Sequence, residues 1–234
     1  MKILMGLYGY IEHDGRVIRS IKSLSTDHQV ILYAHCKSKD FQLANASILK
    51  RETSYYLERP YLEQILFLIS FFWKVIKIKP DLVYLHDYYL AFAGKLVKLF
   101  TSSKVVYDAH ELVIYETGEE VTFRMKHFAF MERIAIKSFD FIIAANDERA
   151  RIMKEYYDLP VIPTVVRNIP DVEISNDLYS KLQLEDKFQI LKNSNASIYV
   201  YQGVITPIRQ IDKLVGEVAK IENCLVLIVG GGSE

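Results

Sequence analysis

The stretch Leu82-Val-Tyr-Leu-His-Asp87 and its counterpart Val105-Val-Tyr-Asp-Ala-His-Glu111 decide the fold class of this chain. Each begins with a short apolar run of the kind that forms a buried β-strand, and each ends in a histidine followed by a carboxylate. The segment between them, Leu90 to Phe100, has the apolar spacing of a helix. A strand, a helix and a second strand form a right-handed crossover with parallel strands, so this stretch predicts an α/β fold.

The same alternation continues on both sides of this stretch. Further strands are predicted at residues 2–8, 29–34, 141–145 and 161–166, with residues 48–57 as the candidate for one more. Further helices are predicted at residues 16–24, 61–78, 124–137 and 148–157. We therefore expect residues 1–170 to form one Rossmann-like domain, a parallel sheet flanked by helices.

The remaining residues predict a linker and the beginning of a second domain. Residues 171–196 are polar and rich in turn residues, with one short helix expected within residues 181–192. Residues 197–234 contain two apolar strands around a helix at residues 208–221, which is the first βαβ unit of a second Rossmann-like domain. The last strand leads into the glycines of residues 230–232 with no helix after it. We therefore expect an incomplete second domain and a truncated two-domain protein.

The composition disfavours several classes of protein. Half of the 234 residues are hydrophobic, and Lys plus Arg equals Asp plus Glu at 29 each, so no strong field should recruit nucleic acid. Two isolated cysteines, Cys36 and Cys224, fit a reducing compartment, and the N-terminus does not read as a signal peptide. A cytoplasmic location is expected. The longest apolar run, Ile65 to Trp73, is shorter than the roughly 20 residues that cross a bilayer.

Two histidine–carboxylate pairs follow predicted strands. Ligands of open α/β sheets bind beyond the carboxyl ends of the strands, where His86-Asp87 and His110-Glu111 lie. A histidine there can exchange a proton with a sugar hydroxyl or a phosphate. The structural alternative is that each histidine caps the next helix or bonds a loop carbonyl. The sequence leaves both readings open, and all four residues are candidates for substrate binding.

Three other positions are candidates for phosphate binding. The loop that ends in Gly15-Arg16 precedes the first predicted helix, whose N-terminus would favour a phosphate. This loop is not Gly-x-Gly-x-x-Gly, which disfavours a dinucleotide cofactor. Arg209 could clamp a diphosphate, and Gly231 lies in a glycine run that would make a second phosphate-facing turn. The alternatives are an ordinary strand–helix glycine, a surface arginine and an artefact of the chain end.

The predicted helix at residues 61–78 is apolar on nearly every side. Its narrow polar stripe consists of Glu63, Ser70, Lys74 and Lys77. Such a helix is either buried or dips into a membrane interface. The lysines beside Trp73 keep the second reading open, so a membrane surface is one expected partner, recruited through the segment from Phe67 to Trp73.

Six pieces of the sequence resemble, in family order, the retaining glycosyltransferases of family 4. They are the two opening stretches, extended to residues 79–87 and 105–112, and residues 132–146, 165–168, 201–209 and 227–232. The resemblance spans nearly the whole chain. It implies a GT-B fold, in which two Rossmann-like domains face a shared cleft. It also implies that the first domain handles the acceptor and the second binds a nucleotide sugar as co-substrate, with no separate cofactor.

The resemblance assigns roles to four residues. Gly15 matches the glycine of the first loop that approaches the donor phosphate, and His110 matches the histidine near the reacting sugar, which makes it the expected catalytic residue. Arg209 matches a basic position that holds the diphosphate. Asn168 matches the asparagine where the chain enters the inter-domain linker.

The sequence also departs from the family pattern. Val204 stands where the family often has arginine, and the two glutamates that hold the donor in the family would lie beyond Glu234. The isolated chain is therefore expected to bind the donor poorly and to transfer little or no sugar. No Asp-x-Asp sequence and no metal-spaced histidine cluster occur, so no metal site is expected.

Three functions of different classes remain. The first is a fragment of a glycosyltransferase that moves a sugar from a nucleotide-sugar donor to a lipid-linked or saccharide acceptor in cell-surface polysaccharide or glycan synthesis. It would act in the cytoplasm or peripherally at the inner face of the membrane. The second is a non-catalytic α/β binding domain that has lost its donor-binding half. The third, a nucleotide-dependent oxidoreductase, is disfavoured because the glycine fingerprint is missing.

Overall fold

The computed structural model describes residues 1–38, 41–43, 46–51, 60–114, 122–169 and 196–232. The chain divides into two compact units, Met1–Asp171 and Val172–Glu234, and each is described by itself. The predicted linker lies almost entirely outside the described residues. The short helix predicted within residues 181–192 lies wholly outside them.

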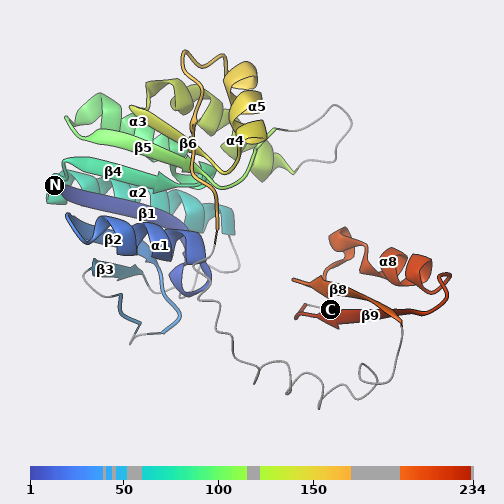
Figure 1. Cartoon of the computed structure of the whole chain (residues 1–234). Helices are drawn as coiled ribbons and strands as arrows, with labels where there is room; N and C mark the ends of the chain where they lie inside the picture. The colour runs from blue at the N-terminus through green and yellow to red at the C-terminus, as the bar shows by residue number, and fades with distance from the viewer. Residues whose placement is uncertain (39–40, 44–45, 52–59, 115–121, 170–195, 233–234) are drawn as a thin grey trace. The chain divides into compact units, whose positions relative to one another are not determined.

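The first unit is built on a seven-stranded parallel sheet, which confirms the predicted α/β class (Figure 1). The strand order is β3-β2-β1-β4-β5-β6-β7. The strands are β1 (Lys2–Tyr10), β2 (Gln29–His35), β3 (Ala46–Arg51), β4 (Leu82–His86), β5 (Lys104–Ala109), β6 (Phe141–Ala144) and β7 (Thr164–Val165). The apolar runs of β1 and β4 lie at the centre because helices cover both of their faces.

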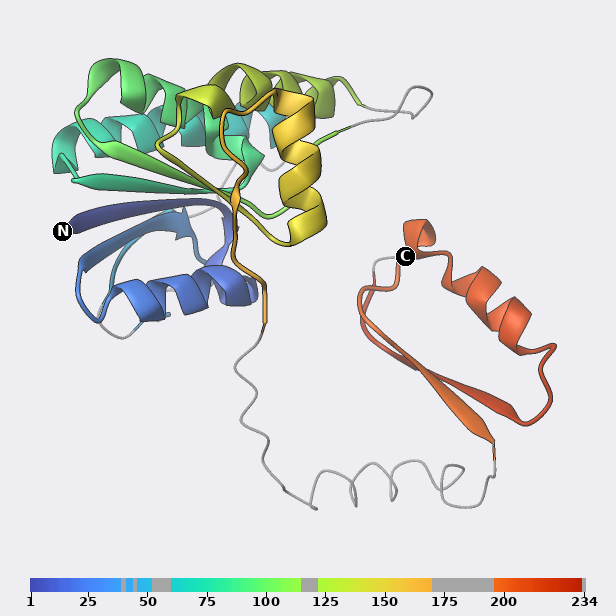
Figure 2. The same ribbon diagram turned by 45° about the horizontal axis from the view of Figure 1, so that its top comes forward.

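Five α-helices connect these strands: α1 (Gly15–Leu24), α2 (Pro60–Ile78), α3 (Ala91–Phe100), α4 (Phe123–Ala135) and α5 (Asp147–Tyr157). Short 3-10 turns η1 (Ile11–His13), η2 (Tyr88–Leu90) and η3 (Ile136–Ser138) lie between them. Helix α1 packs on one face of the sheet, and α2, α3 and α4 pack on the other (Figure 2). The site described below lies on the α1 face.

Several predicted elements are shorter in the structure, for identifiable reasons. The strand expected at residues 161–166 is reduced to Thr164–Val165 because Pro160 and Pro163 cannot donate to the ladder. The strand expected at residues 48–57 runs instead over Ala46–Arg51, and residues 52–59 lie outside the described residues.

Helix α2 is buried on the side that carries Phe67 and Phe71, in agreement with the first of the two readings of this helix. Phe67 and Phe71 lie fully buried in the core beneath β1 and β2, so the proposal that Phe67 contacts lipid is wrong. Glu63, expected in a polar surface stripe, is also buried, with its Oε1 3.3 Å from Nε2 of His35. The wide apolar surface of α2 is explained on this side by packing against the sheet.

The second unit contains one parallel strand pair, β8 (Ser197–Gln202) with β9 (Cys224–Val229), joined through η4 (Pro207–Arg209) and α8 (Ile211–Val218). The predicted helix at residues 208–221 begins later because Gln210 adopts a left-handed backbone, with φ of 50°, that no α-helix continues through.

The glycine run after β9 does not form the expected open turn. The amide of Ile205 donates to the carbonyl of Gly231 at 2.9 Å, and Ile205 bridges Gly232 in parallel, so the run continues the strand pair. A Cβ atom at Gly230 would lie 1.8 Å from the carbonyl oxygen of Gly203. The glycines therefore serve close backbone approach within this unit.

None of the helices in the described part of the chain is long and apolar enough to cross a membrane.

Candidate active site

The carboxyl ends of the central strands bring the two predicted histidines together. His86 is the last residue of β4 and pairs in register with Asp108 of β5. His110 is the first residue after β5. Nδ1 of His86 lies 3.1 Å from Nε2 of His110. The expectation that both histidine pairs lie at one edge of the sheet is met for these two imidazoles.

Asp108 is the centre of this site, although the sequence analysis did not select it. Its Oδ2 atom lies 3.6 Å from Nδ1 of His86 and 3.6 Å from Nε2 of His110. Arg16, from the first turn of α1, holds both carboxylate oxygens, with Nε 3.1 Å from Oδ2 and Nη2 against Oδ1. The hydroxyl of Tyr84 donates to Oδ2 at 3.2 Å. We call Arg16, Tyr84, His86, Asp108 and His110 the Asp108 network.

Burial differs sharply within the Asp108 network. The side chain of His86 is completely buried, and its ring stacks on Tyr84 with centroids 4.7 Å apart. His110 retains an exposed edge. His86 therefore lies beneath His110 and orients it, and His110 is the member of the pair that a ligand from solvent would reach.

The pKa values of the two histidines in the Asp108 network are shifted in opposite directions. Burial lowers the pKa of His86 below 6.5. Burial opposes charge on His110 too, but the carboxylates of Asp108, Asp87 and Asp14 outweigh it and raise its pKa above 6.5. Burial would raise the pKa of Asp108, yet the nearby imidazoles of His110 and His86 and the hydrogen-bonded guanidinium of Arg16 hold it well below 3.8. His110 is therefore the member of the pair that takes a proton more readily.

Imidazole NMR titration should resolve these two histidines. We expect His110 to titrate above pH 6.5 and His86 to stay neutral to well below it, for the reasons given above. Replacing Asp108 by asparagine should lower the pKa of His110, because the nearest anion is removed. The change Asp147→Asn, at an exposed ion pair, should leave it unchanged. Two histidines that titrate together near pH 6.5 would contradict this arrangement.

A basic cavity opens beside His110. Its volume is about 470 Å³, and its lining includes Asp14 and Arg16 of the α1 end, His110, and Arg149, Arg167 and Asn168. Arg149 donates from Nη1 to the carbonyl oxygen of His110, and Arg19 donates to Oδ1 of Asn168. Helices α1 and α5 both begin at this lining, and the positive ends of their dipoles favour a bound anion. The cavity therefore suits a ligand with negative charge and hydroxyl groups.

Arg149 and Arg167 were missed by sequence reasoning. Arg167 immediately precedes Asn168, and its Nη2 atom pairs with the exposed Asp147 at 3.0 Å. Arg149 belongs to the first turn of α5, whose cap is the Asn146 side chain. The local signal at Arg149 was an arginine in the first turn of the helix that follows a strand, as at Arg16.

The other predicted residues of the first unit lie around this edge. Gly15 is the exposed first residue of α1, capped by Asp14, whose Oδ1 accepts from the Val17 amide at 3.0 Å. Asp87 adopts a left-handed φ of 67° and accepts from the Tyr88 amide at 3.0 Å, so it caps η2. Burial raises the pKa of Asp87 to about 6. Glu111 is exposed beside His110.

The two predicted residues of the second unit, Arg209 and Gly231, are both exposed. Arg209 ends η4, and Gly231 bonds Ile205 through its carbonyl as described above. Their roles in donor binding stay predictions.

The two imidazoles and Asp108 could also hold a metal ion, since one ligand atom from each lies within 4.8 Å of the others. Arg16 already neutralises the Asp108 carboxylate, however, and a divalent cation would have to share that carboxylate with a guanidinium. Metal binding would also require both imidazoles to be neutral, against the raised pKa of His110. The residues fit a hydrogen-bonded network better than a metal centre.

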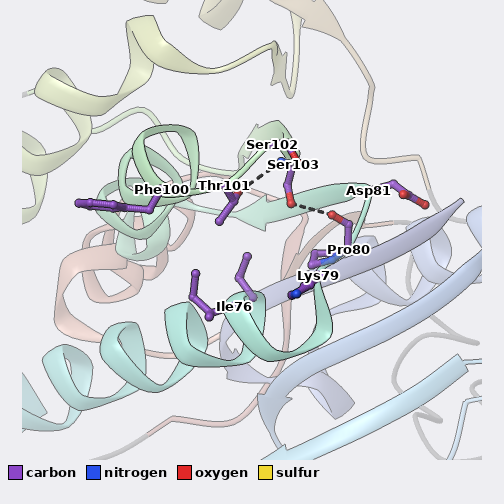
Figure 3. Close-up of a pocket in the computed structure, with 9 residues that line it drawn as sticks. Ile76, Lys79, Pro80, Asp81, Phe100, Thr101, Ser102 and Ser103 are labelled. Atoms are coloured by element: carbon purple, nitrogen blue, oxygen red, sulfur yellow. Dashed lines mark hydrogen bonds between the residues drawn. The ribbon is translucent and has the colours of Figure 1, made fainter.

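A larger cavity, about 550 Å³, lies at the opposite edge of the sheet (Figure 3). It is lined by residues 79–81 before β4 and residues 100–103 before β5. Two of its hydroxyls are used within the protein: Ser103 donates to the carbonyl of Pro80 at 2.6 Å, and Thr101 to that of Val97 at 2.8 Å. Volume alone does not identify the site, because ligands of such sheets bind at the carboxyl ends of the strands.

Comparison with known proteins places these features in a family. The model of Glycosyltransferase Family 4 matches residues 17–173, which is more than half of the chain. This match includes Asp108, His110, Arg149, Arg167 and Asn168. No curated protein matches the sequence.

Solved structures of similar fold cover the whole chain. Sucrose-phosphate synthase from Thermosynechococcus elongatus superposes with a TM-score of 0.72 at 14% identity, over 100% of this chain and 63% of that one. Anabaena HepE in complex with UDP gives 0.65 at 16% identity, over 100% and 62%. The lipopolysaccharide outer core galactosyltransferase WaaB gives 0.55 at 11% identity, over 100% and 62%. At these identities the likeness shows a shared fold, that of GT-B glycosyltransferases. The chain spans less than two thirds of the length of these proteins.

Proposed function

Because the chain belongs to Glycosyltransferase Family 4, we propose that it moves a sugar from a nucleotide-sugar donor to a lipid-linked or saccharide acceptor in cell-surface polysaccharide or glycan synthesis. The observation that carries the proposal is His110, whose pKa Asp108 raises, in the lining of a cavity that also includes Arg149 and Arg167. HepE was solved with UDP, which supports a uridine diphosphate sugar as the donor class.

The proposed chemistry needs a positive environment. Glycosyl transfer passes through an oxocarbenium-like state while a diphosphate leaves, so negative charge develops on the leaving group. Arg149, Arg167 and the imidazolium of His110 would stabilise that charge, together with the exposed Gly15 amide at the α1 N-terminus. We propose that these groups replace a metal ion. Arg209 of the second unit is proposed separately as a residue that binds the diphosphate. Retention of the anomeric configuration follows from family membership and is part of the proposal.

His86 and Arg16 would act through other residues. Arg16 fixes the Asp108 carboxylate, and His86 supports the ring of His110 from below. Asn168 lines the cavity, and Asp87 and Glu111 follow the two histidines in sequence. We propose that these three residues bind hydroxyl groups of the substrates.

We also propose that the protein works in the cytoplasm, at the inner face of the membrane. Cys36 and Cys224 are both free thiols, which is consistent with a reducing compartment. A lipid-linked acceptor would be presented at that membrane face.

A single assay tests transfer against the alternative of a non-catalytic binding domain. UDP release is measured for a panel of UDP-sugars with saccharide and lipid-linked acceptors, with and without EDTA. The expected result is acceptor-dependent release, weak from this chain alone, that EDTA leaves unchanged because arginines replace the metal. UDP-sugar binding without release under every condition would favour the binding domain. Release abolished by EDTA and restored by a divalent cation would contradict metal independence.

A further inference from the structure

Helix α2 exposes a second apolar stripe, on the side opposite to its buried one. Leu62, Leu66, Ile69 and Trp73 recur at the spacing of one helix face, and Lys77 continues the stripe one turn later. Leu62 and Ile69 are exposed, and Trp73 is 61% exposed. A helix packed on a sheet normally turns polar residues outward, so this outward stripe calls for a partner that accepts apolar side chains.

The neighbouring helices extend this apolar surface. At one end, Phe100 of α3 is 68% exposed, and its ring lies 6.2 Å from that of Phe72. At the other end, Phe123 of α4 is 77% exposed, and its ring lies 6.4 Å from that of Tyr61. The three helices lie together on one side of the sheet (Figure 1). We call the outward surface of α2, α3 and α4 the α2–α4 face.

These three helices bury their acidic residues and carry basic residues at the surface. Their two acidic residues, Glu63 and Glu132, are both buried. Their basic residues reach the surface, including Lys74, Lys77, Arg124, Lys126 and Arg133. The whole chain has no net charge, so this basic face is an asymmetry of placement and not of composition.

We infer that the α2–α4 face binds the surface of an anionic lipid bilayer. Exposed Trp, Phe and Ile side chains fit the boundary between headgroups and acyl chains, and the lysines and arginines among them fit anionic headgroups. A nucleic acid would use the basic residues but would leave Ile69 and Leu62 without a partner. A second copy of this chain would place one basic face against another.

Membrane binding of this face would bring the protein to a lipid-linked acceptor, and to that extent the inference rests on the proposed function. The two remain separable because vesicle binding needs no nucleotide sugar. An active transferase that ignores vesicles would contradict only this inference, and a vesicle-binding protein without transfer would contradict only the proposed function.

Trp73 is the single tryptophan of the chain, so its fluorescence reports on this face directly. The full chain is titrated with vesicles of phosphatidylcholine containing about one third phosphatidylglycerol. We expect a blue shift of the emission, quenching by lipids brominated in the acyl chains, and loss of binding at high salt. Vesicles of phosphatidylcholine alone should bind more weakly.

Variants at exposed positions identify the groups responsible, with circular dichroism to verify that each one folds. The double change Lys74→Gln and Lys77→Gln should weaken vesicle binding roughly tenfold or more, since each basic residue contributes to attraction by anionic lipid. Ile69→Ser should weaken binding and reduce the blue shift. Val161→Ser, at an exposed apolar residue outside the three helices, should bind like the wild type.

Three results would overturn the inference. The first is vesicle binding without a blue shift or brominated-lipid quenching. The second is binding that the lysine changes abolish but Ile69→Ser leaves intact, with duplex DNA competing, which would identify a general polyanion surface. The third is a concentration-dependent blue shift in the absence of lipid, which would show that a second copy of the chain covers Trp73.

Discussion

Replacing Asp108 by asparagine should lower the free energy of unfolding by about 3–5 kcal/mol, because it leaves the buried guanidinium of Arg16 without a neutralising carboxylate. Asparagine has nearly the same shape, so a cavity would not explain the loss. Chemical denaturation followed by circular dichroism measures it. The matched control is Asp147→Asn, which breaks an exposed, solvent-screened ion pair with Arg167 and should leave the denaturation midpoint close to that of the wild type.

The pH dependence of this loss tests its electrostatic origin. The pKa of Asp108 is held below its ordinary value of 3.8, so the folded state favours the ionised carboxylate. The resulting stabilisation is fully present above pH 3.8 and is lost as the pH falls through the lower pKa of the folded protein. The difference between wild type and Asp108→Asn should therefore be complete at neutral pH and shrink in acid. A difference that persists unchanged in acid would assign the loss to packing.

Replacing His110 by alanine should reduce kcat/KM for sugar transfer by roughly 10²–10⁴-fold, the range for a positioned acid–base group. Because the pKa of His110 is raised, the imidazolium persists past pH 6.5, and activity should fall as the pH rises through that raised value. UDP release measured across a pH series, in a preparation that transfers sugar, checks both the size of the effect and this alkaline limb.

His28 supplies the matched control for this prediction. It precedes β2 at the opposite edge of the sheet, far from the Asp108 network, and its amide bonds the Leu24 carbonyl. His28→Ala should keep the wild-type rate and pH profile. If His110→Ala transfers sugar at the wild-type rate with the same alkaline limb, His110 is not the catalytic residue.

The layout of the fold could be predicted because it depends on local patterns. Apolar runs such as Leu82–Leu85 are typical of the inner strands of a parallel sheet. The helical spacing of apolar residues between two such runs predicts the helix that connects them. The same logic placed His86 and His110 at one edge. The register that sets His86 directly beside Asp108 depends on pairing between strands, and a single sequence does not carry it.

Asp108 and Arg16 could not be paired from the sequence, since they are 92 residues apart. The available signal was a carboxylate inside the apolar run of β5, two residues before His110 and therefore on the same side of the strand. The two faces of α2 were indistinguishable for a similar reason. Both are apolar, and only packing shows that Phe67 faces the sheet while Trp73 faces outward.

The placement of Arg16 on α1 ties the acid–base state of the site to the docking of a helix. If α1 detached, Asp108 would lose its guanidinium, and the freed carboxylate would draw protons more strongly onto both imidazoles. Docking of α1 therefore favours the pair in which one imidazole is charged, and its detachment would favour charge on both. A ligand that prefers the singly protonated pair would, by thermodynamic reciprocity, tighten the hold of the first helix on the sheet.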